Sequence, residues 1–352
     1  MKRLKRILLA IFVLLLLYLL AWPVSVEPVA WEPPAPPPLE GVYAANHALS
    51  ALERVGEGVG HGPEDVAVDG EGRLYAGMED GRVVRMAADG TGAETLAHTG
   101  GRPLGLDFAP DGTLIVADAI KGLLSVSAAG AVELLSSAAA ELPYGFTDDV
   151  DVGPDGTIYF SDASSKFGIH EYFSDIIEHG GHGRLLAQAP DGEVRVLMDG
   201  LQFANGVAVS PDGAFVLIAE TGAYRIRRYW LSGPRAGNHD VFIDNLPGFP
   251  DGISCNGVDT FWVAFFAPRN PAAESLAPYP SLRKIIMRLP AALRPKPVRR
   301  GLVLGLDVDG RVVHNLQDPD GGFAPITSVE EVGGVLYMGS LKESAIGRLA
   351  VP

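Results

Sequence analysis

The sequence predicts an all-β protein, a six-bladed β-propeller, that follows a single N-terminal transmembrane helix. Six copies of one strand-turn-strand unit recur along the 352 residues. The 43 Gly and 27 Pro residues fall between short apolar runs without a G-X-Y period, which is typical of many turns in an all-β protein. A basic segment followed by a charge-free apolar segment opens the chain.

Residues 1–6 contain four basic side chains and predict a cytoplasmic tail. Residues 7–22 then run for 16 residues without a charge, about 24 Å of helix, and predict a membrane anchor. A cleaved signal peptide is the alternative. The long Leu-rich run without an A-x-A site favours the anchor, which places the remaining chain on the exported side, periplasmic or extracellular.

Residues 23–41 form a Pro-rich stalk with seven prolines. Such composition predicts a semi-rigid polyproline spacer that holds the folded domain away from the bilayer. Residues 42–352 are assigned to the propeller.

The repeat copies align on turns that contain a glycine. They begin at Gly62, Arg102, Thr147, Phe203, Pro250 and Ile326. Three turns read Pro-Asp-Gly and end at Gly112, Gly156 and Gly213, spaced by 44 and 57 residues. The first spacing fits a four-stranded blade. The second predicts an insertion near residues 166–183, and another interrupts the fifth copy near residues 268–300.

The sixth copy has room for only three strands before the chain ends. The segment Ala51–Gly56 is expected to supply the fourth strand, which would close the ring and remove a free sheet edge. An open sandwich is the structural alternative, but it does not account for six copies in register.

Four copies carry an oxygen-bearing side chain at one register. Glu64, Asp148 and Asn205 each lie eight residues before a turn glycine, and Asp251 holds the like position in the fifth copy. The other two copies offer Pro103, nine residues before Gly112, and, approximately, Thr327. Oxygen ligands without His or Cys select a hard cation, and Ca²⁺ tolerates more protein ligands than Mg²⁺. The alternative is that these residues start strands and bond to nearby backbone.

The overall charge and the single cysteine exclude several classes of function. A formal net charge of −15 argues against nucleic acid as a partner, since phosphate binding needs a basic face. Cys255 is alone, so the chain has neither an internal disulfide nor a Cys-based zinc site.

From Tyr43 onward the chain resembles the strictosidine-synthase-like proteins, the family that includes adipocyte plasma membrane-associated protein. The resemblance rests on GPEDVAVDGEGRLYAG, GRPLGLDF, FSDASSKF, FANGVAVSPD, LIAETGAYRIRRYWLSG, LPGFPDGI and QDPDGG. The wider superfamily contains gluconolactonases, paraoxonases and diisopropyl fluorophosphatase. These proteins bind a catalytic calcium through a Glu and Asn/Asp residues where the inner strands start. The resemblance therefore implies a calcium site at Glu64, Asn205 and Asp251 in this chain.

The chain departs from this pattern at two positions. Asp148 stands where the superfamily usually has Asn, which leaves the ligand set at −3. Plant strictosidine synthases use a catalytic Glu at the start of the sixth inner strand, where this chain has Thr327, and their disulfide is also absent. Amine–aldehyde condensation is therefore not expected, and Glu330 and Glu331 are read as ordinary strand residues.

The resemblance implies a calcium-dependent hydrolase of lactones or aryl esters. Calcium would polarise the carbonyl, and Asp251 would be both a ligand and either the nucleophile or the base for water. Asp149 would orient a water or a second cation, or simply support the site. The alternative is a membrane-tethered propeller that binds a ligand or a protein, with a structural calcium and no chemistry.

Other candidate sites are weaker. His179 and His182 have the spacing of metal ligands, and His61 lies close to Glu64 in sequence. Residues 318–322 are read as a turn rather than a calcium loop. The insertion at 268–300 interleaves basic and apolar residues and is interpreted as a membrane-surface segment, a lid over the channel, or a solvated excursion.

Overall fold

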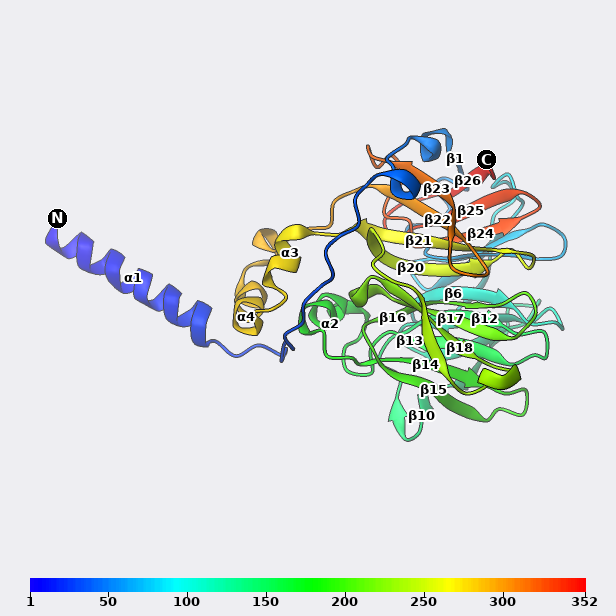
Figure 1. The fold of residues 1–352 in the computed structure, drawn as a ribbon, viewed down its shortest axis with the longest axis horizontal. Coiled ribbons are helices and arrows are strands. Elements are labelled where there is room, and N and C mark those ends of the chain that lie inside the picture. Colours follow the sequence, from blue (N-terminus) through cyan, green and yellow to red (C-terminus); the bar gives the residue numbers. More distant parts are fainter.

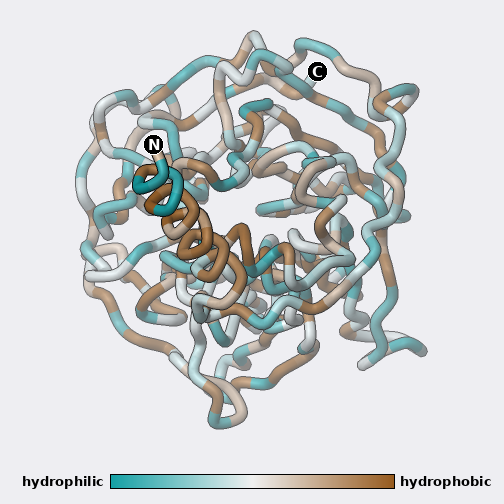
Figure 2. Tube along the Cα trace, turned by 90° about the vertical axis from the view of Figure 1, so that its left-hand side faces the viewer, coloured by the Kyte–Doolittle hydropathy of each residue, from teal (hydrophilic) through white to brown (hydrophobic).

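The computed structural model describes residues 1–352 and has six four-stranded antiparallel sheets arranged around one axis (Figures 1 and 2). One long helix, α1 (Lys2–Ala21), projects from one side of this ring. The six-bladed propeller predicted from the repeats is confirmed.

Each blade is an antiparallel meander whose first strand lies innermost. The first three blades are β2–β5 (Val66–Val68, Leu74–Gly77, Arg82–Met86, Glu94–His98), β6–β9 (Pro103–Phe108, Leu114–Asp118, Gly122–Val126, Val132–Ser136) and β12–β15 (Thr147–Val152, Ile158–Asp162, Gly183–Gln188, Val194–Leu201). The next two are β16–β19 (Ala204–Val209, Phe215–Glu220, Arg225–Trp230, His239–Ile243) and β20–β23 (Gly248–Cys255, Thr260–Pro268, Gly301–Asp307, Val312–Asp318). A small hairpin, β10 (Ala138–Ala139) with β11 (Leu142–Pro143), lies between the second and third blades.

The sixth blade joins the two ends of the propeller sequence. It contains β24 (Ser328–Val332), β25 (Val335–Gly339), β26 (Ile346–Ala350) and β1 (Glu53–Val55). Strand β1 pairs with β26 in antiparallel register, with Arg54 opposite Gly347. The expectation that Ala51–Gly56 supplies the missing strand is thus confirmed, and the ring is closed by hydrogen bonds.

The hydrophobic core lies between neighbouring blades. In one such cluster, Val83 of the first blade and Val116 of the second are fully buried against each other's sheets. The strands read as β-branched and aliphatic runs because both faces of each blade are covered by its neighbours.

The Pro-Asp-Gly turns have the backbone conformation that their sequence predicts. Gly112, Gly156 and Gly213 have φ of +85°, +81° and +65°, which only glycine adopts without strain. Each of these turns joins the innermost strand of its blade to the second strand and so sets how the two strands pair.

Both insertions leave the ring at the end where the inner strands begin. Helix α2 (Tyr172–Glu178) connects β13 to β14, while α3 (Pro271–Leu276) and α4 (Pro280–Arg288) connect β21 to β22. The pairing of Gly248 with Pro268 places the exit toward α3 beside the start of β20. We call this end of the propeller the lid face (Figure 1).

The Pro-rich segment does not stand free as a spacer. Residues 23–40, here called the strap, lie extended across the lid helices. Val26 is buried in a cluster with Phe167, Ile177 and Ile286, and the Val29 N–H donates to the Glu178 carbonyl at 2.8 Å. The prediction of a free spacer was wrong. The proline content predicts that the segment is stiff, but it does not predict that Val26 packs against an apolar surface of the lid helices.

Candidate metal site in the central channel

The four register-matched residues lie where four inner strands begin, at the lid face. Asp148, Asn205 and Asp251 belong to β12, β16 and β20, and Glu64 precedes β2. All four are more than nine-tenths buried. We call them the oxygen quartet.

The four quartet side chains face the channel, and two of them, Asn205 and Asp251, are in contact. The Asn205 amide donates to an Asp251 carboxylate oxygen at 2.5 Å. The charges of Asp148 and Asp251 both act on Glu64. The carboxylate oxygens of Glu64, Asp148 and Asp251 do not all lie within 4.8 Å of one another. These three side chains would therefore have to move inward to bind one shared cation.

Two quartet carboxylates have no hydrogen-bond donor from the protein. Glu64 and Asp148 are only 7% and 5% exposed, yet neither carboxylate accepts a hydrogen bond from a side chain or from backbone. A buried charge in this condition is costly unless something else compensates it. The alternative of a strand-start residue bonded to nearby backbone therefore does not describe either side chain.

The quartet carboxylates titrate above their ordinary range. Burial raises the pKa of Glu64 and of Asp148 well above normal, and the charges of the neighbouring carboxylates raise both further. Burial also raises the pKa of Asp251 to about 8, against the lowering effect of the Asn205 hydrogen bond. These shifts are those of buried acidic groups that outnumber the cationic side chains near them.

Arg102 is a site residue that the sequence analysis missed. Its guanidinium is buried and donates to the carbonyls of Gly62 and Gly77. Burial lowers the pKa of Arg102, and the charge of Glu64 opposes that lowering. Arg102 brings the formal charge near the quartet from −3 to −2, the charge that a divalent cation neutralises. The repeat gives no signal for Arg102, because the aligned copies carry Gly or Phe ten residues before the turn glycine.

Acidic side chains deeper in the channel accept hydrogen bonds from the backbone of neighbouring blades, unlike Glu64 and Asp148 of the quartet. An Asp65 oxygen accepts the Leu106 N–H at 2.8 Å, and an Asp107 oxygen accepts the Val152 N–H at 2.8 Å. Each bond runs from one blade to the next, so these carboxylates tie blades together. Their occupied oxygens distinguish them from Glu64 and Asp148.

Asp149 belongs to these ties. One of its oxygens accepts the Val207 N–H of the next blade, and the other accepts the Val150 N–H, both at 2.8 Å. Of the two roles considered for Asp149, support of the site matches this geometry. Thr327 ties the last blade to the first, because its hydroxyl donates to the Glu64 carbonyl at 2.7 Å.

A cavity of about 120 Å³ occupies the channel beyond the quartet. Asp107, Asp151 and Glu330 line it, together with main-chain and side-chain atoms of β20. Burial, then the charge of Asp107, raises the pKa of Glu330 well above normal. Glu330 is therefore a channel residue rather than the ordinary strand residue expected, whereas Glu331 accepts the indole N–H of Trp262 at 2.6 Å.

An apolar wall stands beside the quartet on the lid side. Leu104, Phe146 and Phe203 pack in one cluster, and the last two rings meet edge-to-face at 5.6 Å. Ile176 of α2 packs against this cluster, so a lid helix covers it. Phe203 has a φ of +59°, an uncommon conformation for an aromatic residue, two residues before Asn205.

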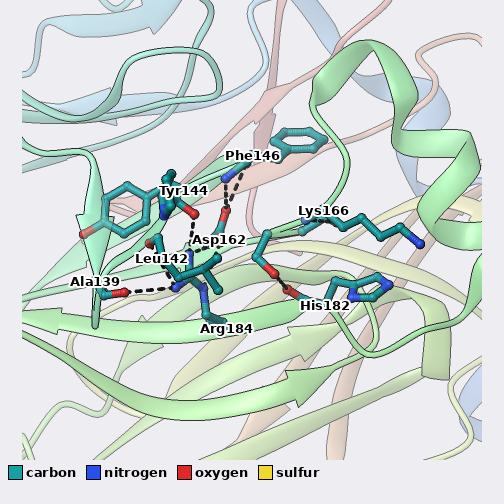
Figure 3. Close-up of polar contacts among 12 residues, drawn as sticks. Ala139, Leu142, Tyr144, Phe146, Asp162, Lys166, His182 and Arg184 are labelled. Atoms are coloured by element: carbon teal, nitrogen blue, oxygen red, sulfur yellow. Dashed lines mark hydrogen bonds and ion pairs between the residues drawn. The ribbon is translucent and has the colours of Figure 1, made fainter.

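A buried ion pair fixes the loop that leads to Asp148 (Figure 3). Asp162 accepts two hydrogen bonds from Arg184, at 2.6 and 3.0 Å, and two more from the N–H groups of Gly145 and Phe146. Arg184 also donates to the carbonyls of residues 139, 142 and 143. One pair thus holds both the β10–β11 hairpin and the start of β12.

The histidine candidates do not converge on a common ligand. The His179 ring stacks on Trp31 of the strap at 4.1 Å, while His182 Nε2 lies 2.7 Å from a Glu178 oxygen. His61 is half exposed and lies 2.8 Å from Glu79.

The turn at residues 318–322 lies outside the channel. His47, Asp318 and Asp320 offer ligand atoms within 4.8 Å of one another. The Asp318 oxygens accept the N–H groups of Asp320 and Gly322, at 3.1 and 2.7 Å, as expected for a turn.

Comparison with known proteins agrees with this architecture. Residues 148–234 match the family described as strictosidine synthase, and residues 41–86 match strictosidine synthase-like, N-terminal. Protein STRICTOSIDINE SYNTHASE-LIKE 6 of Arabidopsis thaliana is 37% identical, over 86% of this chain and 82% of its own length. This chain belongs to the strictosidine synthase-like family. The human adipocyte plasma membrane-associated protein, also 37% identical over 95% of this chain and 85% of its own, shares that relationship.

Solved structures support the fold of this strictosidine synthase-like protein. A gluconolactonase from Xanthomonas campestris superposes with a TM-score of 0.63 at 18% identity, covering 94% of this chain and 99% of its own. A calcium-binding protein, regucalcin, from Agrobacterium tumefaciens gives 0.59 at 18% identity, covering 84% and 90%. The protein thus has the propeller fold found among lactonases.

Proposed function

We propose that this strictosidine synthase-like protein is a calcium-dependent hydrolase of lactones or aryl esters. The oxygen quartet would hold the ion, with Asp251 as the catalytic group. The observation that carries the proposal is the pair of buried carboxylates, Glu64 and Asp148, that no protein donor satisfies. A divalent cation would compensate the charge of these groups, and their hard oxygens suit Ca²⁺.

The residues around the quartet suit ester chemistry. A bound calcium would polarise the substrate carbonyl and stabilise the oxyanion that forms on attack. The Asn205 amide fixes one oxygen of Asp251, leaving the other to take a proton from water or to attack the carbonyl itself. The apolar wall at Leu104, Phe146 and Phe203 would receive the alkyl or aryl part of the substrate.

We further propose that α1 crosses the membrane, with the N-terminus in the cytoplasm and the propeller on the exported side. Helix α1 is long and apolar enough to span a bilayer and none of it is buried in the protein. Basic residues precede it, which favours this orientation.

The decisive experiment is a hydrolysis panel of aryl acetates and lactones, run with and without a chelator beside Asp251→Ala. We expect activity to disappear both with the chelator and in the variant. Full activity in either case would overturn the proposal.

A non-catalytic propeller with a structural calcium is the second candidate. It is favoured by the burial of the quartet, because a buried ion would also neutralise these carboxylates without doing chemistry. In that case the chelator would lower the melting temperature, and no ester in the panel would be hydrolysed with or without calcium.

The quartet also predicts how calcium and pH act together on stability. Groups whose pKa is raised by folding stabilise the protein below their unfolded value near 4, and that stability is lost as pH rises through their folded value. For Asp251 the folded value is about 8. With a chelator, the melting temperature should therefore fall from pH 5 to pH 9.

Excess calcium should remove most of this fall, so its stabilising effect should grow with pH. Differential scanning fluorimetry at fixed ionic strength measures both curves. A calcium effect that is constant across this pH range would contradict the assignment of the ion to the quartet.

A further inference from the structure

We propose that the lid face of the propeller rests on the bilayer surface, and that residues 279–298 bind anionic lipid headgroups there. This inference is independent of the hydrolase activity. It concerns the insertion between β21 and β22, which the chemistry of the channel does not use.

The insertion is docked directly on the end of α1. Arg288, the last residue of α4, donates to the carbonyls of Leu19 and Trp22 at 2.9 and 2.6 Å. The Tyr18 hydroxyl donates to the Arg288 carbonyl at 2.9 Å. Tyr18 and Trp22 are residue types enriched at the membrane–water boundary. If α1 spans the bilayer, α4 lies at that boundary.

The strap holds this arrangement in place. Lys284 of α4 pairs with Glu27 of the strap at 2.6 Å, and Arg283 donates to the Val29 carbonyl. Val26 is buried between α2 and α4. Residues 23–40 therefore run from α1 past the lid helices to the propeller (Figure 1), and their contacts restrain the lid face relative to α1.

The insertion exposes large apolar side chains on the surface beside α1. The exposed fractions are 57% for Tyr279, 42% for Leu282, 67% for Leu293 and 59% for Val298. On α4, Ile286 is buried against the protein, whereas Leu282, one turn earlier on the same side of the helix, is exposed. The helix is therefore seated on the protein near its C-terminal end and leaves apolar side chains exposed near its N-terminal end, as in a segment that lies at an interface.

The charge of the insertion is opposite to that of the whole protein. Residues 283–300 contain seven Lys or Arg and no Asp or Glu, within a chain of net charge −15. Arg294 donates only to the carbonyls of Met287 and Leu289, and exposed Lys296 pairs with no carboxylate. Arg283 and Arg288 are buried, and Lys284 and Arg299 pair with carboxylates. Arg294 and Lys296, which lie among exposed apolar side chains, are therefore the basic groups that fit an anionic lipid surface.

Spin-label depth measurements on the full chain in nanodiscs test the proposal. In a Cys255→Ser background, single nitroxides are placed at Leu282→Cys, at Leu293→Cys and, as the matched control, at Val258→Cys. Val258 is 72% exposed in the β20–β21 turn, at the end of the propeller opposite the lid face. Accessibility to oxygen and to a water-soluble nickel chelate reports lipid or water at each label.

In nanodiscs containing phosphatidylglycerol, we expect the labels at 282 and 293 to favour oxygen severalfold over the control at 258. Equal, water-like accessibility at all three positions would overturn the proposal. In nanodiscs of phosphatidylcholine alone, or in an Arg294→Glu/Lys296→Glu protein, the difference should shrink. The matched charge control is Arg311→Glu, on the β22–β23 turn, which should change nothing. A difference that survives both changes would refute the anionic-lipid part.

Discussion

Replacing Glu64 or Asn205 with alanine is expected to abolish calcium binding and to lower hydrolysis by about a hundred- to a thousandfold, the usual loss for a stabilising group at an acyl-transfer site. The two side chains come from different blades and have no substitute at the lid-side end of the channel. Calorimetric titration of calcium and initial rates on an aryl acetate check the two effects separately.

Asp107→Asn serves as the control for this pair of variants. Asp107 is an acidic channel residue whose two oxygens accept the N–H groups of Phe108 and Val152, and an asparagine oxygen keeps the bond to Val152 in the next blade. Binding and rate should stay within about twofold of the parent protein, since neither polarising group is altered. An Asn205→Ala protein that hydrolyses esters at full rate without metal would refute the mechanism.

The Asp162→Ala substitution should have the largest effect on stability, roughly 3–5 kcal/mol, the cost of breaking a buried ion pair. It leaves Arg184 buried without its partner and leaves the N–H groups of Gly145 and Phe146 without acceptors (Figure 3). Urea unfolding followed by tryptophan fluorescence measures the change.

Asp80→Ala is the matched comparison for that substitution. Asp80 also pairs with an arginine, Arg82, at 2.8 Å, but both side chains are substantially exposed to water. Loss of such a pair should change the free energy of unfolding by less than about 1 kcal/mol. If the two variants destabilised the protein equally, the loop before β12 would not depend on Asp162 as the structure indicates.

The ring and the position of the quartet could be predicted from the sequence because both follow from periodicity. Aligning the copies on Gly112, Gly156 and Gly213 placed Asp148 and Asn205 at equivalent strand starts. In a propeller, residues at the same position in each repeat lie at the same height around one axis. The alignment of the repeats therefore predicts which residues lie near one another in space.

What the sequence did not predict depends on contacts between segments that do not repeat. Arg102 has no counterpart at its register, since the other copies carry Gly62, Phe146 and Phe203 there. The strap was misread because its docking depends on Val26 meeting α2 and α4, elements that exist only as insertions. Composition carries no information about such pairings.

The pairing of β1 with β26 has a consequence for biogenesis. The first strand of the propeller leaves the ribosome soon after α1, but its partner follows 291 residues later, counted from Val55 to Ile346. At roughly 5–20 residues per second, β1 waits tens of seconds with both edges open. A chain released before Ile346 would keep an unpaired first strand, so synthesis through β26 is a condition for escaping aggregation or proteolysis.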